Sequence, residues 1–190
     1  MFRAERAEYF NPDEAASRIL SSNASIAQTE ANSAAWYQGK RLLERAIAER
    51  SAFAFETTLG GETITDLLET ALSARIEVKV WYVGLHSPEL HIARVCARAA
   101  RGGHDIPEEK IRARFDSSRL NLIRLMPKLT ELRVYDNSEE ADPNAGIPPE
   151  PKFLLHMANG KIVSLCNLAS TPPWAKPILA AAIRLPRKPL

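Results

Sequence analysis

Short apolar runs alternate with longer helical patterns between residues 1 and 137 of this 190-residue chain. Such runs, bounded by polar positions, are typical of strands buried in a parallel sheet. They lie at Ala52–Phe55, Val78–Val83 and Leu132–Tyr135, and a very short strand is expected to end at Tyr9-Phe10. Strands that alternate with helices predict an α/β fold with a mainly parallel sheet, in which ligands bind at the carboxyl ends of the strands.

Helix signals fill the intervals between these strands. Asn11-Pro12-Asp13-Glu14 has the order of a helix start, with an N-cap, a first-position proline and acids in the first turn. Further helices are expected over about residues 26–49, over about 63–73 after the Gly60-Gly61 break, and after the cap Ser87-Pro88-Glu89.

The sequence changes character after residue 137. Residues 138–151 form a Pro-rich acidic linker, and residues 152–190 form a C-terminal segment. In that segment two apolar runs flank Asn159-Gly160, which predicts a β-hairpin. A helix is expected near residues 174–183, followed by a basic, Pro-rich tail.

Composition narrows the class of function. The chain is 45% hydrophobic and 25% charged, as globular domains are, and its net charge of +2 gives no argument for a nucleic-acid or anionic-membrane partner. No run approaches the roughly 18 apolar residues of a membrane span, and the first residues lack a signal-peptide core. We therefore expect a cytoplasmic protein.

The two cysteines indicate neither a disulfide framework nor a metal centre. Cys96 and Cys166 are far apart and match no metal-ligand spacing. Because Cys96 falls on an apolar helix face, we expect it to be a small core residue. No metal ligand is assigned from the sequence.

Six arginines gather between residues 94 and 119, on both sides of Gly102-Gly103. They are Arg94, Arg98, Arg101, Arg112, Arg114 and Arg119. Spacings of three and four place the first three on one helical face, and Arg112 and Arg114 are expected on a second helix about two turns long. Guanidinium groups donate bidentate hydrogen bonds to phosphate, so the pair of helices is a candidate clamp for an anion. The alternative is a solvated helical hairpin with surface arginines.

Carboxylates follow two of the expected strands. Asp13 comes shortly after Tyr9-Phe10, and Glu56-Thr57-Thr58 directly follows Ala52–Phe55. An aspartate beside a substrate hydroxyl can accept its proton during phosphoryl transfer. The alternative for Asp13 is helix capping, and for Glu56 it is a strand-end acid satisfied by nearby backbone.

Several blocks, in order and with natural spacing, resemble the zeta toxin family, P-loop kinases related to the toxins of bacterial toxin–antitoxin systems. The resemblance covers about residues 8–137, and a Pro-Trp-Ala-Lys-Pro segment at 173–177 resembles the tails of bacterial members. The blocks are Asn11-Pro12-Asp13-Glu14, residues 53–59 (FAFETTL), residues 98–108 (RAARGGHDIPE), residues 111–115 (IRARF) and residues 134–138 (VYDNS).

The resemblance implies roles for single residues. Asp13 would be the catalytic base, and Glu56, Thr57 and Thr58 would hold the substrate, a nucleotide sugar such as UDP-N-acetylglucosamine in the best-known members. Arg98 and one of Arg112 or Arg114 would grip the ATP phosphates, with Arg101 as a second candidate on the first lid helix. The resemblance also implies ATP and Mg²⁺ as cofactors and an antitoxin protein as a partner.

The chain departs from the family in its phosphate-binding loop. Members begin with a strand and a Walker A loop that ends in Gly-Lys-Ser/Thr. Gly-Lys occurs here only at Gly39-Lys40 and Gly160-Lys161, and neither is followed by Ser or Thr. The missing strand is central in such sheets, so we expect a gap between Ala52–Phe55 and Val78–Val83.

Two main hypotheses follow for the function. In the first, these residues are a truncated form of a P-loop kinase with a helical lid at about residues 94–119, and the activity belongs to a longer chain. In the second, the chain is a non-catalytic relative that binds a partner or a nucleotide sugar. Nucleic-acid binding by the arginine segment is a third reading, which the lack of interleaved aromatics disfavours.

Overall fold

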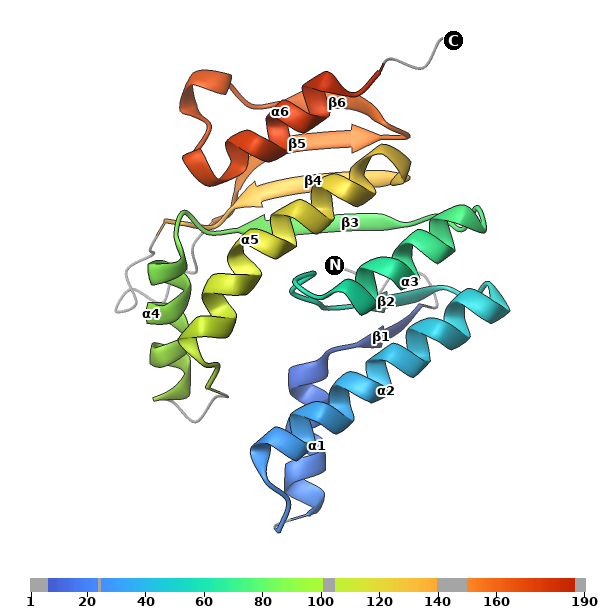
Figure 1. The fold of residues 1–190 in the computed structure, drawn as a ribbon, viewed down its shortest axis with the longest axis vertical. Coiled ribbons are helices and arrows are strands. Elements are labelled where there is room, and N and C mark those ends of the chain that lie inside the picture. The colour runs from blue at the N-terminus through green and yellow to red at the C-terminus, as the bar shows by residue number, and fades with distance from the viewer. Residues whose placement is uncertain (1–6, 24, 101–104, 140–149, 187–190) are drawn as a thin grey trace. The chain divides into compact units, whose positions relative to one another are not determined.

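The computed structural model describes residues 7–23, 25–100, 105–139 and 150–186 (Figure 1). The chain divides into two compact units, an N-terminal unit, Met1–Thr58, and a C-terminal unit, Leu59–Leu190. Their described strands form two separate sheets, one of two strands and one of four. The protein is therefore a mixed α/β protein, and each unit is described by itself.

The N-terminal unit joins a small parallel sheet to a helical hairpin. β1 (Glu8–Phe10) pairs in parallel with β2 (Phe53–Phe55). Between them along the chain, α1 (Pro12–Ser22) and α2 (Gln28–Glu49) pack side by side (Figure 1). The parallel arrangement brings the carboxyl ends of both strands to the same edge of the sheet.

Small residues allow the close packing of this unit. The side chains of Phe10, Ala15, Ala16, Ala31 and Ala35 form its buried cluster. A Cβ atom added to Gly39 would lie 2.6 Å from the Phe10 ring. α2 can therefore pack against Phe10 only because Gly39 has no side chain.

The C-terminal unit contains a mixed four-stranded sheet. Its strands are β3 (Lys79–Gly84), β4 (Glu131–Asp136), β5 (Lys152–Ala158) and β6 (Lys161–Leu165), in that spatial order. β3 and β4 are parallel, whereas β4–β5 and β5–β6 are antiparallel. The turn between β5 and β6 has positive φ angles at Asn159 (50°) and Gly160 (74°), which confirms the predicted hairpin.

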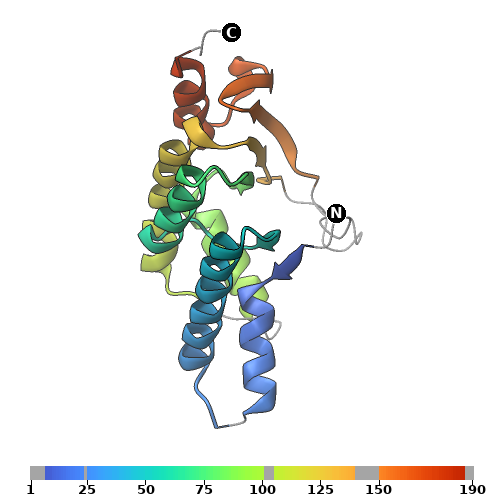
Figure 2. The ribbon, with the colours of Figure 1, turned by 90° about the vertical axis from the view of Figure 1, so that its right-hand side faces the viewer.

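The C-terminal unit also contains helices, of which α5 (Glu108–Leu125) and α6 (Lys176–Arg184) cover one face of the sheet (Figure 1 and Figure 2). The other described helices are α3 (Glu62–Ser73) and α4 (Pro88–Ala99), with short 3-10 turns at Met126–Lys128, Leu168–Ser170 and Pro173–Ala175. Figure 2 shows α5 and α6 on the same side of the strands. Leu122 and Leu125 of α5 and Ile178 of α6 are fully buried, together with Val134 and Leu155 of the sheet.

On the opposite face of the sheet, several large apolar side chains are exposed among the described residues. Trp81 and Val83 of β3 are 40% and 52% exposed, and Phe153 of β5 is 39% exposed. Strands in parallel sheets are usually covered on both faces, so the alternating exposure of β3 differs from the usual pattern.

Several sequence predictions need correction. The expected interruption between Ala52–Phe55 and Val78–Val83 is found, because β2 and β3 belong to different sheets. The prediction of a mainly parallel sheet is wrong, because the C-terminal hairpin joins β4 to form a mixed sheet. The predicted buried strand Ala52–Phe55 is only half-buried over Phe53–Phe55, since one two-stranded sheet cannot enclose it. Cys96 is exposed rather than in the core, because no residue of α4 is buried.

The second lid helix is much longer than predicted. α5 has 18 residues, about five turns rather than two. Its buried stripe includes the polar residues Ser118 and Asn121, which hide the apolar periodicity, and Pro127 is the first helix breaker after it. Most of the linker, residues 140–149, and the end of the tail, residues 187–190, lie outside the described residues.

None of the helices in the described part of the chain combines the length and the apolar character needed to cross a membrane.

Candidate functional site

The carboxyl edge of the β1–β2 sheet carries the predicted acidic residues. The backbone N–H of Glu56 donates to the carbonyl of Phe10 at 3.1 Å, which fixes the first residue after β2 beside the end of β1. Asn11, directly after β1, donates from Nδ2 to Oε2 of Glu56 at 3.1 Å. Its Oδ1 accepts from the backbone N–H of Asp13 at 2.8 Å. One asparagine side chain therefore joins the segment of Asp13 to the carboxylate of Glu56.

Tyr9 is a further residue of this group. Its hydroxyl donates to Oε1 of Glu56, and this hydrogen bond is the main cause that raises the pKa of Tyr9 above its ordinary value. Both oxygens of Glu56 thus accept a hydrogen bond from the end of β1. Because an ionised carboxylate can accept about four hydrogen bonds, Glu56 keeps acceptor capacity for a ligand.

The residues predicted to bind the substrate or to act as the base are all open to solvent. Asp13, Glu56, Thr57 and Thr58 are exposed. The helix cap of α1 is Asn11 rather than the side chain of Asp13, because Asn11 accepts from the backbone N–H of both Asp13 and Glu14. The predicted N-cap is confirmed. Asp13 lies in the first turn of α1, where the helix dipole favours an acid, so the structural alternative for Asp13 stands beside the catalytic one.

Replacing Asn11 with Ala is expected to lower the free energy of unfolding of the N-terminal unit by about 1 kcal/mol, because the cap of α1 is lost. Chemical denaturation followed by circular dichroism measures the change. The matched control is Ser21→Ala, which removes an exposed hydroxyl from the same helix that bonds only to the carbonyl of Ser17. Equal stability of the two variants would contradict the cap.

The predicted arginine clamp lies on α4 and α5, which contact each other in the C-terminal unit (Figure 1). Arg98 is exposed in the last turn of α4. Arg112 of α5 donates from Nη1 to Oε1 of Glu89 in α4 at 2.6 Å. Arg101 lies outside the described residues.

Arg114 differs from Arg112 in its surroundings. It is exposed and makes no hydrogen bond or ion pair within the described ranges. Its stem packs against Gly60, since a Cβ atom added at that glycine would lie 2.6 Å from Cγ of Arg114. Gly60 directly precedes the N-cap of α3, Gly61, which has no side-chain cap. Arg114 therefore lies near a helix N-terminus, where the helix dipole favours anions.

The turn that leads into α3 is held by polar residues of α5. Ser117 donates to the carbonyl of Gly60 at 2.8 Å, and Asn121 donates from Nδ2 to the carbonyl of Leu59 at 2.9 Å. Leu59 is buried and adopts a left-handed backbone conformation with φ of 53°. The contact with Leu59 explains why α5 buries Asn121, whereas Ser118, the other buried polar residue of α5, forms a hydrogen bond with the hydroxyl of Tyr82 in β3 at 2.9 Å.

Two of the six arginines have structural roles instead. Arg94 donates from its two terminal nitrogens to the carbonyls of Asn137 (2.8 Å) and Glu139 (3.1 Å). Arg119 donates to the carbonyl of Trp174 at 3.2 Å, and its guanidinium lies 4.3 Å from the centre of the Phe115 ring. The guanidinium N–H groups of Arg94 and Arg119 bind backbone carbonyls of distant segments, so we no longer include these two arginines in the candidate clamp.

The two Gly-Lys pairs are not phosphate loops. Gly39 lies inside α2 against Phe10, and Gly160 forms the β5–β6 turn. Among the residues that the structure describes, no group of three or more His, Cys, Asp or Glu side chains could hold a metal ion.

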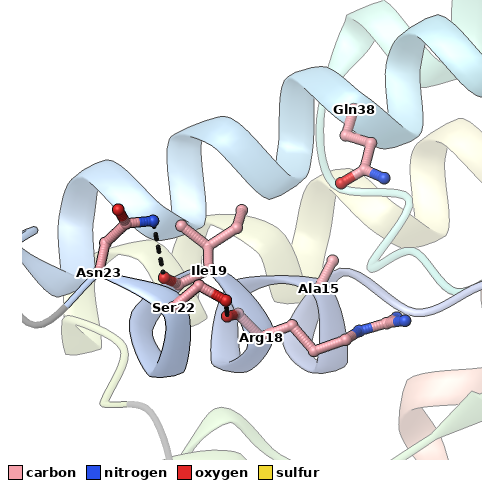
Figure 3. Close-up of a pocket in the computed structure, with 6 residues that line it drawn as sticks. All are labelled: Ala15, Arg18, Ile19, Ser22, Asn23 and Gln38. Atoms are coloured by element: carbon pink, nitrogen blue, oxygen red, sulfur yellow. Dashed lines mark hydrogen bonds between the residues drawn. The ribbon is translucent and has the colours of Figure 1, made fainter.

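A shallow hollow of about 280 Å³ lies between α1 and α2 (Figure 3). It is lined by Ala15, Arg18, Ile19, Ser22, Asn23 and Gln38, none of which the sequence singled out. Ser22 and Asn23 donate to backbone carbonyls of their own helix at 2.9 and 3.3 Å, so they offer little to a ligand.

The predicted residues thus fall into two groups. Asp13 and Glu56 belong to the N-terminal unit, where Asn11 links them, and Arg98, Arg112 and Arg114 belong to the C-terminal unit. Sequence reasoning missed Tyr9 and the second role of Asn11. The only signal for either is its place at the predicted strand end, since Tyr9 lies in the strand that pairs with β2 and Asn11 directly follows it.

Comparison with known proteins adds one partial match. A protein of Haemophilus influenzae described as an uncharacterized protein is 34% identical over 74 residues, which are 39% of this chain and 53% of that protein. The chain therefore spans about half the length of this relative. No protein-family model matches the chain, and no solved structure is significantly similar to it.

Proposed function

We propose that this chain belongs to a zeta-toxin-like kinase that transfers a phosphoryl group from ATP to a hydroxyl of a small substrate, such as a nucleotide sugar. The proposal rests on the ordered sequence blocks between residues 8 and 137. It includes a cytoplasmic location and an antitoxin protein as a partner.

The N-terminal unit would bind the acceptor. The observation that carries the proposal is that Tyr9 and Asn11 both donate hydrogen bonds to Glu56, which follows β2 at the carboxyl edge of the β1–β2 sheet. Asn11 also directly precedes the first turn of α1. Held in this way, Glu56 can accept from hydroxyl or amide donors of a sugar. Asp13, exposed in that first turn, is the candidate base that takes the proton of the reacting hydroxyl.

The C-terminal unit would bind the phosphates. Arg98, Arg112 and Arg114 fit this task, because exposed guanidinium groups match phosphate oxygens and neutralise charge as the phosphoryl group moves. Arg101 is a fourth candidate by resemblance. ATP would supply the phosphoryl group and Mg²⁺ would neutralise negative charge on the phosphates, but no described residue is assigned to the metal.

The proposal requires a phosphate-binding loop that this chain does not contain. The division of the strands into two sheets, with β2 and β3 in different ones, supports the part of the proposal in which a central strand is absent. An in-frame strand and Gly-Lys-Ser/Thr upstream of Met1 would supply that loop. A stop codon there without the motif would count against the kinase.

The second candidate is a non-catalytic protein that binds a nucleotide sugar. The fixation of Glu56 favours it equally, since a held carboxylate serves binding as well as catalysis. It differs from the kinase in predicting no phosphoryl transfer even when the upstream segment is present.

Both candidates predict that UDP-N-acetylglucosamine binds the N-terminal unit through Glu56. Glu56→Gln is expected to weaken binding about tenfold, because a charge-assisted acceptor becomes neutral and the contacts from Tyr9 and Asn11 weaken. Isothermal titration calorimetry on the full chain measures the change, with Glu49→Gln at the exposed end of α2 as a control. Equal affinity of both variants would remove Glu56 from the acceptor site.

A further inference from the structure

The contact between α4 and α5 involves one of the proposed phosphate ligands. Nη1 of Arg112 lies 2.6 Å from Oε1 of Glu89, and Nη2 lies 3.8 Å from Oε2 of Glu108. Glu89 comes from the first turn of α4, and Glu108 lies one turn before Arg112 in α5. The same guanidinium edge that would meet a phosphate therefore already faces carboxylates.

The geometry of this pair is close to that of a bound phosphate oxygen. A charge-assisted N–H···O contact to phosphate has a length of about 2.7–2.9 Å, so Glu89 takes the position that such an oxygen needs. Because Arg112 donates to it, the pKa of Glu89 lies below its ordinary value. The carboxylate therefore stays ionised under the conditions in which a kinase works.

Solvent exposure makes this contact reversible. The side chains of Arg112 and Glu89 are 49% and 65% exposed, and ion pairs with such exposure are weak. An anion with more than one negative charge can thus displace Glu89, at the cost of the lost pair. Arg114, by contrast, makes no such pair within the described residues and is open to an anion at once.

We infer that Glu89 is an autoinhibitory residue, which competes with phosphate for Arg112 and occupies its guanidinium group until a polyphosphate displaces it. The inference rests on the proposed function, because it takes Arg112 as a phosphate ligand. It goes beyond that function in assigning a regulatory role to an acid of α4 that neither the sequence blocks nor the resemblance marks.

The test is the binding of inorganic pyrophosphate to the full chain at low salt, measured by calorimetry. Glu89→Gln removes the competing charge and keeps the shape of the side chain. Binding is expected to tighten about threefold, the effect of losing one exposed ion pair. Glu109→Gln is the matched control, because it removes an exposed charge in the first turn of α5 that pairs with no described residue.

A double variant, Glu89→Gln with Arg112→Ala, shows whether the gain passes through Arg112. The inference expects the double variant to bind no better than Arg112→Ala alone. It is overturned if Glu89→Gln binds no tighter than Glu109→Gln, if the gain persists without Arg112, or if no variant binds pyrophosphate. The gain is measured against Glu109→Gln, which loses the same charge, and without turnover, so a failure of phosphoryl transfer alone would leave the inference standing.

Discussion

Replacing Trp174 with Ala is expected to lower the free energy of unfolding of the C-terminal unit by about 3–5 kcal/mol. Trp174 is 3% exposed, and its ring lies over Gly84 at the end of β3. Its Nε1 donates to Oδ1 of Asp136 at the end of β4 at 3.0 Å, and its carbonyl accepts from Arg119. Removal of the ring leaves a cavity and takes one hydrogen bond from Oδ1 of Asp136, which still accepts from the hydroxyl of Ser138. Urea denaturation followed by circular dichroism measures the loss.

A pair of glycine variants tests the same packing without deleting the ring. A Cβ atom at Gly84 would lie within 2.8 Å of three carbons of Trp174, so Gly84→Ala is expected to cost about 1–3 kcal/mol. At Gly61 an added Cβ meets no atom within 4 Å and φ is −111°, so Gly61→Ala is the control. Equal stability of the two variants, or a Trp174→Ala loss below about 1 kcal/mol, would refute this account of the strand ends.

The second large effect concerns Asp13. In a longer product of the gene that carries a phosphate-binding loop, Asp13→Asn is expected to lower the rate of phosphoryl transfer at least about 100-fold, because the acceptor hydroxyl loses its base. Binding of ATP and of the nucleotide sugar should change little, since the variant keeps the size of the side chain. Steady-state kinetics and calorimetry separate the two effects.

Glu14→Gln is the matched control for Asp13→Asn. It removes a neighbouring exposed charge from the first turn of α1, so both variants alter the helix N-terminus alike. Transfer retained in Asp13→Asn, or lost equally in Glu14→Gln, would remove Asp13 from the role of base.

Local signals predicted much of the fold. The cap Asn11 with Pro12 placed α1 correctly, and Asn159-Gly160 identified the β5–β6 hairpin, because these residues fix backbone geometry by themselves. The length of α5 could not be predicted in the same way. Asn121 is a polar residue at a buried position of α5, and its burial depends on a hydrogen bond to the carbonyl of Leu59, which lies 62 residues earlier in the sequence.

The candidate site was predictable as a set of residues but not as a set of contacts. Tyr9 and Glu56 are 47 residues apart, and no spacing in the sequence shows that one holds the other. Arg94 and Arg119 resemble the other arginines in sequence, yet their donors bind carbonyls of distant segments. Which arginines remain available to an anion depends on these long-range partners, and periodicity contains no information about them.

Phosphoryl transfer itself tests the central claim most directly. A protein that carries a Gly-Lys-Ser/Thr loop ahead of these residues is incubated with ATP, Mg²⁺ and UDP-N-acetylglucosamine, and the products are analysed by mass spectrometry and phosphorus NMR. The account predicts a sugar nucleotide that carries one additional phosphoryl group on a hydroxyl, with formation of ADP. A protein that binds both ligands and forms no such product would contradict the kinase and leave the non-catalytic binding protein.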